Sequence, residues 1–195
     1  MFLVIPAVMA LISCRSVIHP PSGVAEPQTV ILITHGKSSS LMLPDGRGGS
    51  TRWAYGDWRY YALSDTGVSA SIAAVLWPTP SALGRQMIDE STTSPERAVQ
   101  RLGIGVGEVL VISVDRTAVD ALNDHLTELF VESGETPTYN PIARLEFVHH
   151  PDPYSLPNSS NRVVARWLED LGCEVDGLRL FSRWRVETAS PEFRR

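Results

Sequence analysis

The sequence predicts an α+β fold in which a small mixed or antiparallel sheet packs against helices. Two runs rich in β-branched residues, 29–34 and 108–114, predict buried strands, and a strongly amphipathic helix is predicted directly after Asp115. Strands and helices do not alternate regularly, which disfavours a doubly wound parallel sheet. The chain has 195 residues, of which 43% are hydrophobic and 20% charged, enough for one globular domain.

The first predicted elements surround a run of aromatic residues. The strand at residues 29–34 is expected to pair with residues 41–43 as a hairpin, and a turn-rich loop, DGRGGS, follows at residues 45–50. Residues 52–61 carry five aromatic side chains around Gly56 and Asp57. Ser64 or Asp65 then provides a cap for a helix that Pro78 ends.

Two helices flank the second buried strand. A short helix is predicted over residues 94–103, with Pro95 at its first helical position. Asp115 caps the clearest helix of the chain, and Gly134 ends it. Its apolar face is formed by residues at helical spacing, namely Val119, Leu122, Leu126 and Phe130.

The C-terminal part repeats the mixture of strand and helix. Residues 142–148 predict a third strand, and a last helix is expected to begin near Ser159 or Ser160 and to end at Gly172. Residues 178–186 predict one or two further strands. The whole of residues 29–195 is therefore expected to form one domain.

Composition limits the classes of function. The formal net charge is −5 and no basic run stands out, so the sequence predicts no nucleic-acid partner. Two cysteines are too few for a disulfide scaffold. Residues 149–150 (HH) lack the spacing of a metal-ligand pair, and no glycine-rich phosphate loop follows a strand. Neither a metal nor a cofactor is predicted.

The N-terminus predicts a signal for export and lipidation. Residues 1–13 are almost wholly apolar but too short to span a bilayer as a helix, and they lead into LISC, which resembles the lipobox of bacterial lipoproteins. That resemblance implies lipidation of Cys14, a membrane anchor and a place in the bacterial cell envelope; Arg15 after the cysteine favours the outer membrane. No Lys or Arg precedes the apolar run, so a short uncleaved anchor is the alternative. Residues 14–28 are expected to be the lipidated cysteine and a linker.

Three segments, in order and spacing, resemble a bacterial domain-of-unknown-function family of uncharacterised envelope proteins. They are residues 34–44 (THGKSSSLMLP), 54–61 (AYGDWRYY) and 154–168 (YSLPNSSNRVVARWL). The family's patterns at these places are S-H-G-W-H-T-G-[LI]-V-L-P, G-W-G-D-x-x-F-Y and Y-x-L-x-x-x-C-N-x-W-x-A-x-x-L. The resemblance covers nearly all of the chain after the expected linker.

This resemblance implies a permuted papain-like fold, similar to cell-wall amidases. In such folds a cysteine at a helix N-terminus is paired with a histidine on a neighbouring strand, because the helix amides and the imidazole both favour the thiolate. In this chain Ser38 stands at the histidine position and Ser160 at the cysteine position. The expected domain is therefore a catalytically degenerate papain-like protein, or pseudoenzyme.

Other histidines are candidate substitutes for the missing base. A serine hydroxyl needs a general base, and His35, His149 and His150 are the candidates for one beside Ser160. Odd offsets on a strand face opposite sides, so His35 is not expected simply to replace Ser38. The structural interpretation of Ser160 is a helix N-cap. Cys173 follows a predicted helix C-terminus and is expected to be an inert buried thiol.

The aromatic segment suggests binding rather than catalysis. Asp57, Trp58 and Tyr60, together with Asn161, are the candidate binding residues, in a groove that Ser38 and Ser160 would complete. The expected ligands or partners are a peptidoglycan fragment, a lipid or an envelope protein. Asp57 has an alternative interpretation as a turn or cap residue.

Three enzyme classes are alternatives. One is a residual serine- or thiol-type hydrolase or acyltransferase of the cell envelope. A second is a histidine phosphatase, suggested by His35-Gly36 after a strand, although Thr34 stands where the phosphate-binding arginine of that family belongs. A third is an α/β-hydrolase, but the segment around Ser69 lacks the final glycine of a nucleophile elbow.

Overall fold

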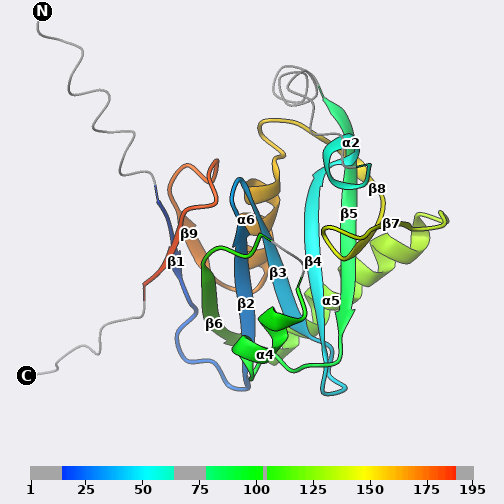
Figure 1. The fold of residues 1–195 in the computed structure, drawn as a ribbon. Helices are drawn as coiled ribbons and strands as arrows, with labels where there is room; N and C mark the ends of the chain where they lie inside the picture. The colour runs from blue at the N-terminus through cyan, green and yellow to red at the C-terminus, as the bar shows by residue number, and fades with distance from the viewer. Residues whose placement is uncertain (1–14, 64–77, 103–104, 188–195) are drawn as a thin grey trace, which may run out of the picture.

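A computed structural model describes residues 15–63, 78–102 and 105–187. These residues form four helices, one large antiparallel sheet and one small sheet, so the predicted α+β class is confirmed (Figure 1). The expectation of a small sheet is wrong, because seven strands pair in one layer. In spatial order they are β6 (Val109–Asp115), β2 (Pro27–His35), β3 (Ser38–Pro44), β4 (Ser50–Asp57), β5 (Thr79–Ile88), β8 (Leu145–Tyr154) and β7 (Thr138–Asn140).

The small sheet contradicts the predicted linker. Strand β1 (Ser16–His19) lies between β10 (Trp184–Val186) and β9 (Glu174–Asp176), parallel to the first and antiparallel to the second. Ile18 of β1 is fully buried in the main core, so the folded domain begins before residue 29. The linker prediction failed because the partners of β1 come from the far end of the chain.

Helices cover both faces of the large sheet. The longest, α5 (Arg116–Glu132), and α6 (Ser160–Asp170) pack on one face, and α4 (Pro95–Gln100) packs on the other (Figure 1). The single turn α2 (Trp58–Tyr61) follows β4 directly. As predicted, Asp115 caps α5, because its side chain accepts a hydrogen bond from the backbone N–H of Thr117.

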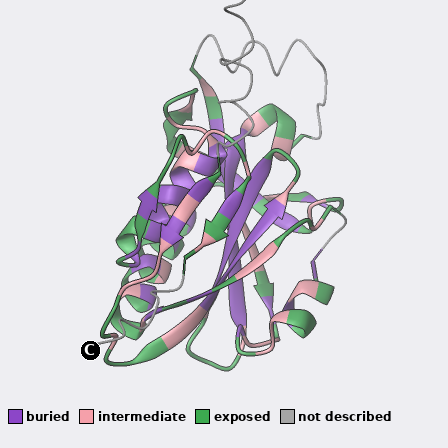
Figure 2. Ribbon diagram, turned by 90° about the vertical axis from the view of Figure 1, so that its left-hand side faces the viewer, coloured by how far each residue is buried: buried purple, intermediate pink, exposed green. Residues whose placement is uncertain are grey.

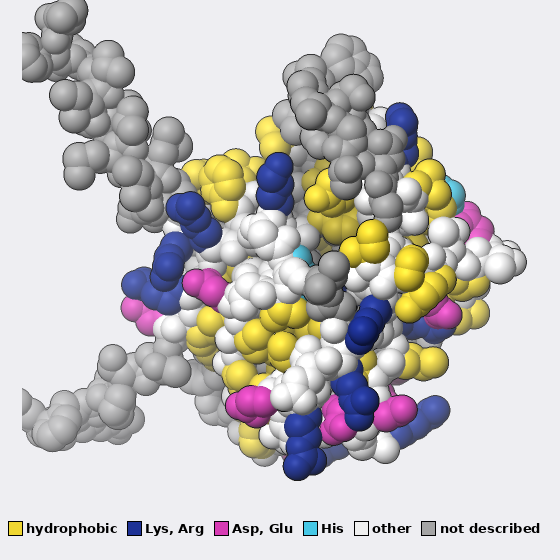
Figure 3. Space-filling model, in the orientation of Figure 1, with side chains coloured by type: hydrophobic (Ala, Val, Ile, Leu, Met, Phe, Trp, Pro, Cys, Tyr) yellow, Lys and Arg dark blue, Asp and Glu magenta, His cyan; other side chains and the backbone are white. Residues whose placement is uncertain are grey.

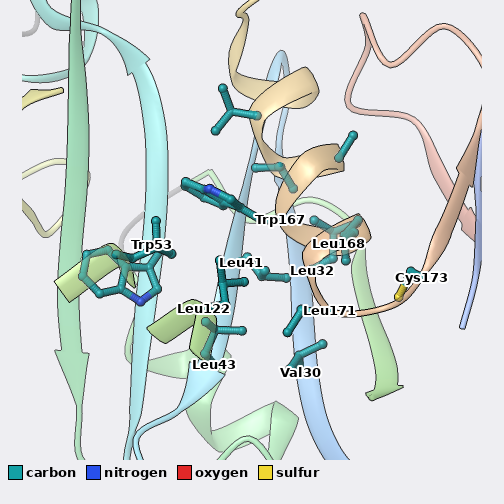
Figure 4. Close-up of a cluster of buried hydrophobic side chains, with 14 of the residues drawn as sticks. Val30, Leu32, Leu41, Leu43, Trp53, Leu122, Trp167, Leu168, Leu171 and Cys173 are labelled. Atoms are coloured by element: carbon teal, nitrogen blue, oxygen red, sulfur yellow. The ribbon is translucent and has the colours of Figure 1, made fainter. Parts of the chain in front are cut away.

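The continuous apolar run of β2 is explained by burial on two sides. Val30 and Leu32 belong to the cluster under α5 and α6, whereas Ile31 and Ile33 belong to the cluster under α4. Figure 4 shows side chains of the larger cluster, with Trp167 and Leu168 on α6 and Trp53 on β4. Trp53 packs against Phe130 of α5. Buried residues accordingly concentrate in the sheet and in the helix surfaces that face it (Figure 2).

Other predicted elements agree in kind and differ in their ends. The hairpin of β2 and β3 turns at Gly36, whose φ of 71° suits glycine, and α4 lies inside the predicted helix. The third predicted strand begins later, at Leu145, and runs on to Tyr154. In the predicted strand region at 178–186, only Trp184–Val186 is a strand. The predicted signal peptide, Cys14, Ser69 and the helix after Ser64 lie outside the described residues.

Candidate functional site

The two serines that the resemblance pairs lie beside one tyrosine. Ser38 begins β3 and Ser160 begins α6, and both are buried, at 7% and 3% exposure. Burial raises the pKa of the Tyr61 hydroxyl, and interactions with the hydroxyls of Ser38 and Ser160 partly offset that rise. Ser160 Oγ itself makes no hydrogen bond of normal geometry in the part of the chain that the structure describes. Ser38 and Ser160 therefore share a tyrosine as a neighbour.

Ser160 is not the N-cap of α6, contrary to expectation. The cap position belongs to Ser159, which has extended backbone angles, and the Ser159 side chain makes no capping hydrogen bond. Ser160 is the first helical residue. Burial raises the pKa of Tyr154, and an interaction with the backbone N–H of Ser160 partly offsets that rise. Tyr154, at the end of β8, therefore lies close to the N-terminus of α6.

Neither His149 nor His150 acts on Ser160. The two neighbours point to opposite faces of β8, so they contact different partners. His149 Nδ1 lies 2.9 Å from Glu135 Oε2, and its ring stacks on Trp58 with centroids 3.6 Å apart. His150 Nδ1 accepts from the backbone N–H of Asp152 at 3.0 Å, and burial lowers its pKa.

Asp57 and Asn161 have structural partners of their own. Asp57 Oδ1 accepts from the N–H of Tyr60 at 3.0 Å, which makes Asp57 the N-cap of α2, and its Oδ2 accepts from Thr79. Asn161 Oδ1 accepts from Ser39 Oγ at 2.9 Å, while its amide donates to the carbonyl groups of Lys37 and Leu180. Both side chains hold the fold together at the places where the sequence suggested a binding groove.

A pocket of about 410 Å³ lies on the face of the sheet opposite α5 and α6, beside these positions. Its size falls within the range of small-molecule sites. Figure 3 shows hydrophobic side chains across the face that carries α4, with Lys and Arg side chains around them. Of the predicted site residues, His35, Ser38 and Tyr60 line this pocket, whereas Asp57, Trp58, Ser160 and Asn161 do not. The lining includes His35, Ser38, Arg52, Tyr60, Tyr61, Ile142, Ala143 and Leu145.

Arg52 carries a buried positive charge beside the pocket. The residue is 5% exposed, and burial lowers the pKa of its guanidinium to about 10. Its Nε donates to Ser40 Oγ at 3.0 Å, and its Nη1 donates to the side chain of Gln86 and to the Ala143 carbonyl. Its Nη2 lies 3.1 Å from His35 Nε2. All four partners are neutral, so no carboxylate among the described residues balances this charge.

His35 completes the same network. Its Nε2 accepts from Ser40 Oγ at 2.8 Å and from Arg52, and its Nδ1 donates to the Gly105 carbonyl at 3.2 Å. This tautomer is assigned from the hydrogen bonds, because an arginine can only donate. Burial, and then the charge of Arg52, lower the pKa of His35 to about 4. The imidazole is therefore neutral at pH 7.

Ser40 and His35 have the spacing of a nucleophile and a base, but only His35 lines the pocket. Ser40 is fully buried and is not part of the pocket lining. Its hydroxyl also accepts from Arg52, so it is engaged on both sides. The network can hold Arg52 in place, but a substrate carbonyl in the pocket has no access to Ser40 Oγ.

Sequence reasoning missed Ser40 and Arg52. The signal for Ser40 was the hairpin itself: with His35 opposite Ser38, the next residue on the same face of β3 is Ser40. Arg52 alternates with Trp53 on β4, and its neighbours on the sheet follow only from the order of the strands. No local sequence pattern predicts the position of Arg52 beside the pocket.

The pocket wall formed by residues 140–145 is held by two polar anchors. Asn140 is buried; its Oδ1 accepts from the N–H groups of Ile142 and Ala143, and its amide donates to the Tyr61 carbonyl at 2.6 Å. Arg144 has a φ of 54°, which non-glycine residues adopt rarely, and its side chain reaches the Arg101 carbonyl. These bonds connect the turn to α2 and to the end of α4.

Comparison of the chain with family models, curated proteins and solved structures finds no match. The resemblance to the envelope family therefore stays a prediction. Within the described ranges, no helix is both long and apolar enough to cross a membrane. In the same ranges, no cluster of three or more His, Cys, Asp or Glu side chains could hold a metal ion.

Proposed function

We propose that this protein is a catalytically inactive, papain-like binding domain that takes a small ligand in the pocket beside Arg52. The observation that carries the proposal is the placement of Tyr61 beside Ser38 and Ser160. The resemblance to the envelope family implies that these two serines stand at the positions of a thiol hydrolase's reactive pair. Two serines and a tyrosine of raised pKa contain no group that could accept a proton from a nucleophile at neutral pH. The pocket next to them remains large enough for a ligand.

The proposal includes the place of the protein in the cell. A lipid on Cys14 would anchor the domain to a bacterial envelope membrane, most simply the outer one. A peptidoglycan fragment, a lipid or an envelope protein would then be the available ligand or partner. Strand β1 begins at Ser16, so the folded domain would lie directly beside its anchor.

A second candidate is a residual serine hydrolase, favoured by the 2.8 Å separation of Ser40 Oγ and His35 Nε2. The burial of Ser40 is the argument against it. In this candidate the nucleophile is Ser40 and the base is His35. It therefore differs from the predicted pairing of Ser160 with His149 or His150, whose rings have other partners.

Labelling with a fluorophosphonate serine-hydrolase probe tests the inactive character. We expect no labelling of the purified wild-type protein. If labelling appears, two pairs of variants identify the residues responsible. Ser40→Ala and His35→Ala test one site, and Ser160→Ala and His150→Ala test the other. Labelling that is lost in Ser40→Ala and His35→Ala would make the protein a hydrolase that uses that pair. Labelling that is lost in Ser160→Ala and His150→Ala would make it a hydrolase of the papain-like site.

A further inference from the structure

We propose that the pocket binds a small amphiphilic anion, whose carboxylate or phosphate is held by Arg52. This inference rests on the proposed binding function and names the chemistry of its ligand. It starts from a charge imbalance. A buried ion is unfavourable unless a partner of opposite charge compensates it.

Several other arginines of the described chain have a carboxylate partner. Arg85, Arg101, Arg116 and Arg179 each lie within ion-pair distance of a glutamate. All four are more exposed than Arg52 and so need a counter-ion less. Of these five arginines, Arg52 is the most deeply buried and the one without a carboxylate partner. It is also the one that lines the pocket.

The hydrogen bonds of Arg52 leave room for one more acceptor. A guanidinium has five N–H groups. Its Nε and Nη1 use three of them on Ser40, Gln86 and Ala143, and one N–H of Nη2 points to His35 Nε2. The second N–H of Nη2 has no acceptor among the described residues. An anionic oxygen in the pocket would both take this N–H and balance the charge.

The rest of the lining indicates the other half of the ligand. Tyr60 and Tyr61 from α2, with Ile142 and Leu145 from the opposite wall, present aromatic and apolar surface. Such surface is suited to a short hydrocarbon or ring. A fatty acid and an alkyl phosphate share this chemistry, since each joins an anionic head to an apolar body.

Isothermal titration calorimetry with four probes tests the inference on the wild-type protein. Octanoate and octyl phosphate carry both features, octanol lacks the charge, and inorganic phosphate lacks the apolar body. We expect both amphiphilic anions to bind at least tenfold more tightly than octanol. Tighter binding of octanoate than of octyl phosphate would indicate a carboxylate head, and the reverse a phosphate. Equal binding of octanol and octanoate would overturn the role of Arg52 while leaving a binding pocket.

Two pairs of variants locate the anion. Arg52→Gln is expected to weaken octanoate binding about 10- to 100-fold, the effect of losing a charged hydrogen bond. Arg85→Gln, on the neighbouring strand but paired with Glu146, is the matched control and is expected to leave binding unchanged. Since Arg52→Gln also disturbs a buried network, Ile142→Glu is a second test. This exposed rim residue leaves the network intact, and its new charge should repel octanoate, whereas Ile142→Gln should not.

Failure of the anion inference and failure of the proposed inactive function give different results. Loss of octanoate binding in Arg85→Gln as well as in Arg52→Gln would show a general effect of charge and overturn the assignment. Absence of heat with both amphiphilic anions at millimolar concentration would overturn the inference about the ligand. Fluorophosphonate labelling, by contrast, would overturn the inactive character and not the anion site.

Discussion

At the scale of single residues, the site is shaped by a close approach of Tyr61 to the backbone of β4. A Cβ atom placed on Gly56 would lie 2.1 Å from the Tyr61 ring. The ring lies over this glycine, which brings its hydroxyl to Ser38 and Ser160. The pair of Gly56 and Tyr61 therefore explains how an aromatic side chain comes to lie where the resemblance expects reactive groups.

Gly56→Ala tests this arrangement. We expect it to destabilise the protein by about 1–3 kcal/mol, the usual effect of overpacking a buried site. Urea denaturation followed by tryptophan fluorescence measures the change. In a Tyr61→Ala background the same substitution should cost much less, because the clashing ring is gone. An equal cost in both backgrounds would mean that another contact is responsible.

His35 gives the residue-scale prediction for pH. Its pKa is lowered from 6.5 to about 4, so below pH 6.5 the unfolded state binds a proton that the folded state does not. Stability is therefore complete above pH 6.5 and falls as the pH drops toward 4, by about 2–3 kcal/mol from this group. The charged and polar partners that surround it are Arg52 on β4, Ser40 on β3 and the Gly105 carbonyl.

The measurement is the free energy of unfolding in urea at several pH values between 4 and 7. His35→Gln removes the titrating group, and its stability should vary less with pH than that of the wild type. Other groups contribute to both curves, among them His150, whose pKa is also lowered. The difference between the two proteins isolates His35. Parallel curves would show that His35 titrates normally in the folded protein.

At the scale of elements, the success of the sequence predictions follows the range of the interactions. Helix α5 was predicted with its cap and its four buried residues, because a 3.6-residue period and an N-cap are local features. Strand β5 was not predicted, although it is central. It contains Pro80 and Gly84. The ring of Phe147 on β8 packs directly against Gly84, in the space that a Cβ atom would take. A glycine that packs against a distant ring has no local signature.

Strand β1 supplies the prediction at this scale. Ile18→Ala should destabilise the protein by about 2–5 kcal/mol, because Ile18 is fully buried in the main core. Ile142→Ala is the control, since Ile142 is 57% exposed and should change stability little. Chemical denaturation of both variants gives the comparison. A negligible effect at Ile18 would restore the interpretation of this segment as a linker.

At the scale of the whole molecule, the large sheet and α6 enclose one main core that includes Cys173. Burial raises the pKa of this free thiol to about 11, so both access and ionisation oppose its reaction in the native state. The rate at which Cys173 is alkylated therefore measures how often the fold opens. The burial of this thiol agrees with its expected inertness.

Alkylation measures that opening. In a Cys14→Ser variant at pH 8, iodoacetamide should modify Cys173 very slowly, and denaturant should restore the rate of an ordinary thiol. The native rate should increase in Ile18→Ala in proportion to its loss of stability, because Ile18 belongs to the same core. Rapid modification of the wild type would indicate local exposure of the helix end that carries Cys173.

The sequence by itself determined the α+β class, the paired strands at 29–34 and 41–43, and the helices that follow Asp115 and Ser159. Each of these depends on hydrophobic periodicity, caps or turns within a few residues. The tertiary structure alone decided the seven-strand order, the inclusion of β1, and the meeting of His35, Ser40 and Arg52 beside the pocket. These features depend on which strands pair with one another. The alternation of side chains along a strand determines which face of the sheet each residue is on, but not which strand lies beside it.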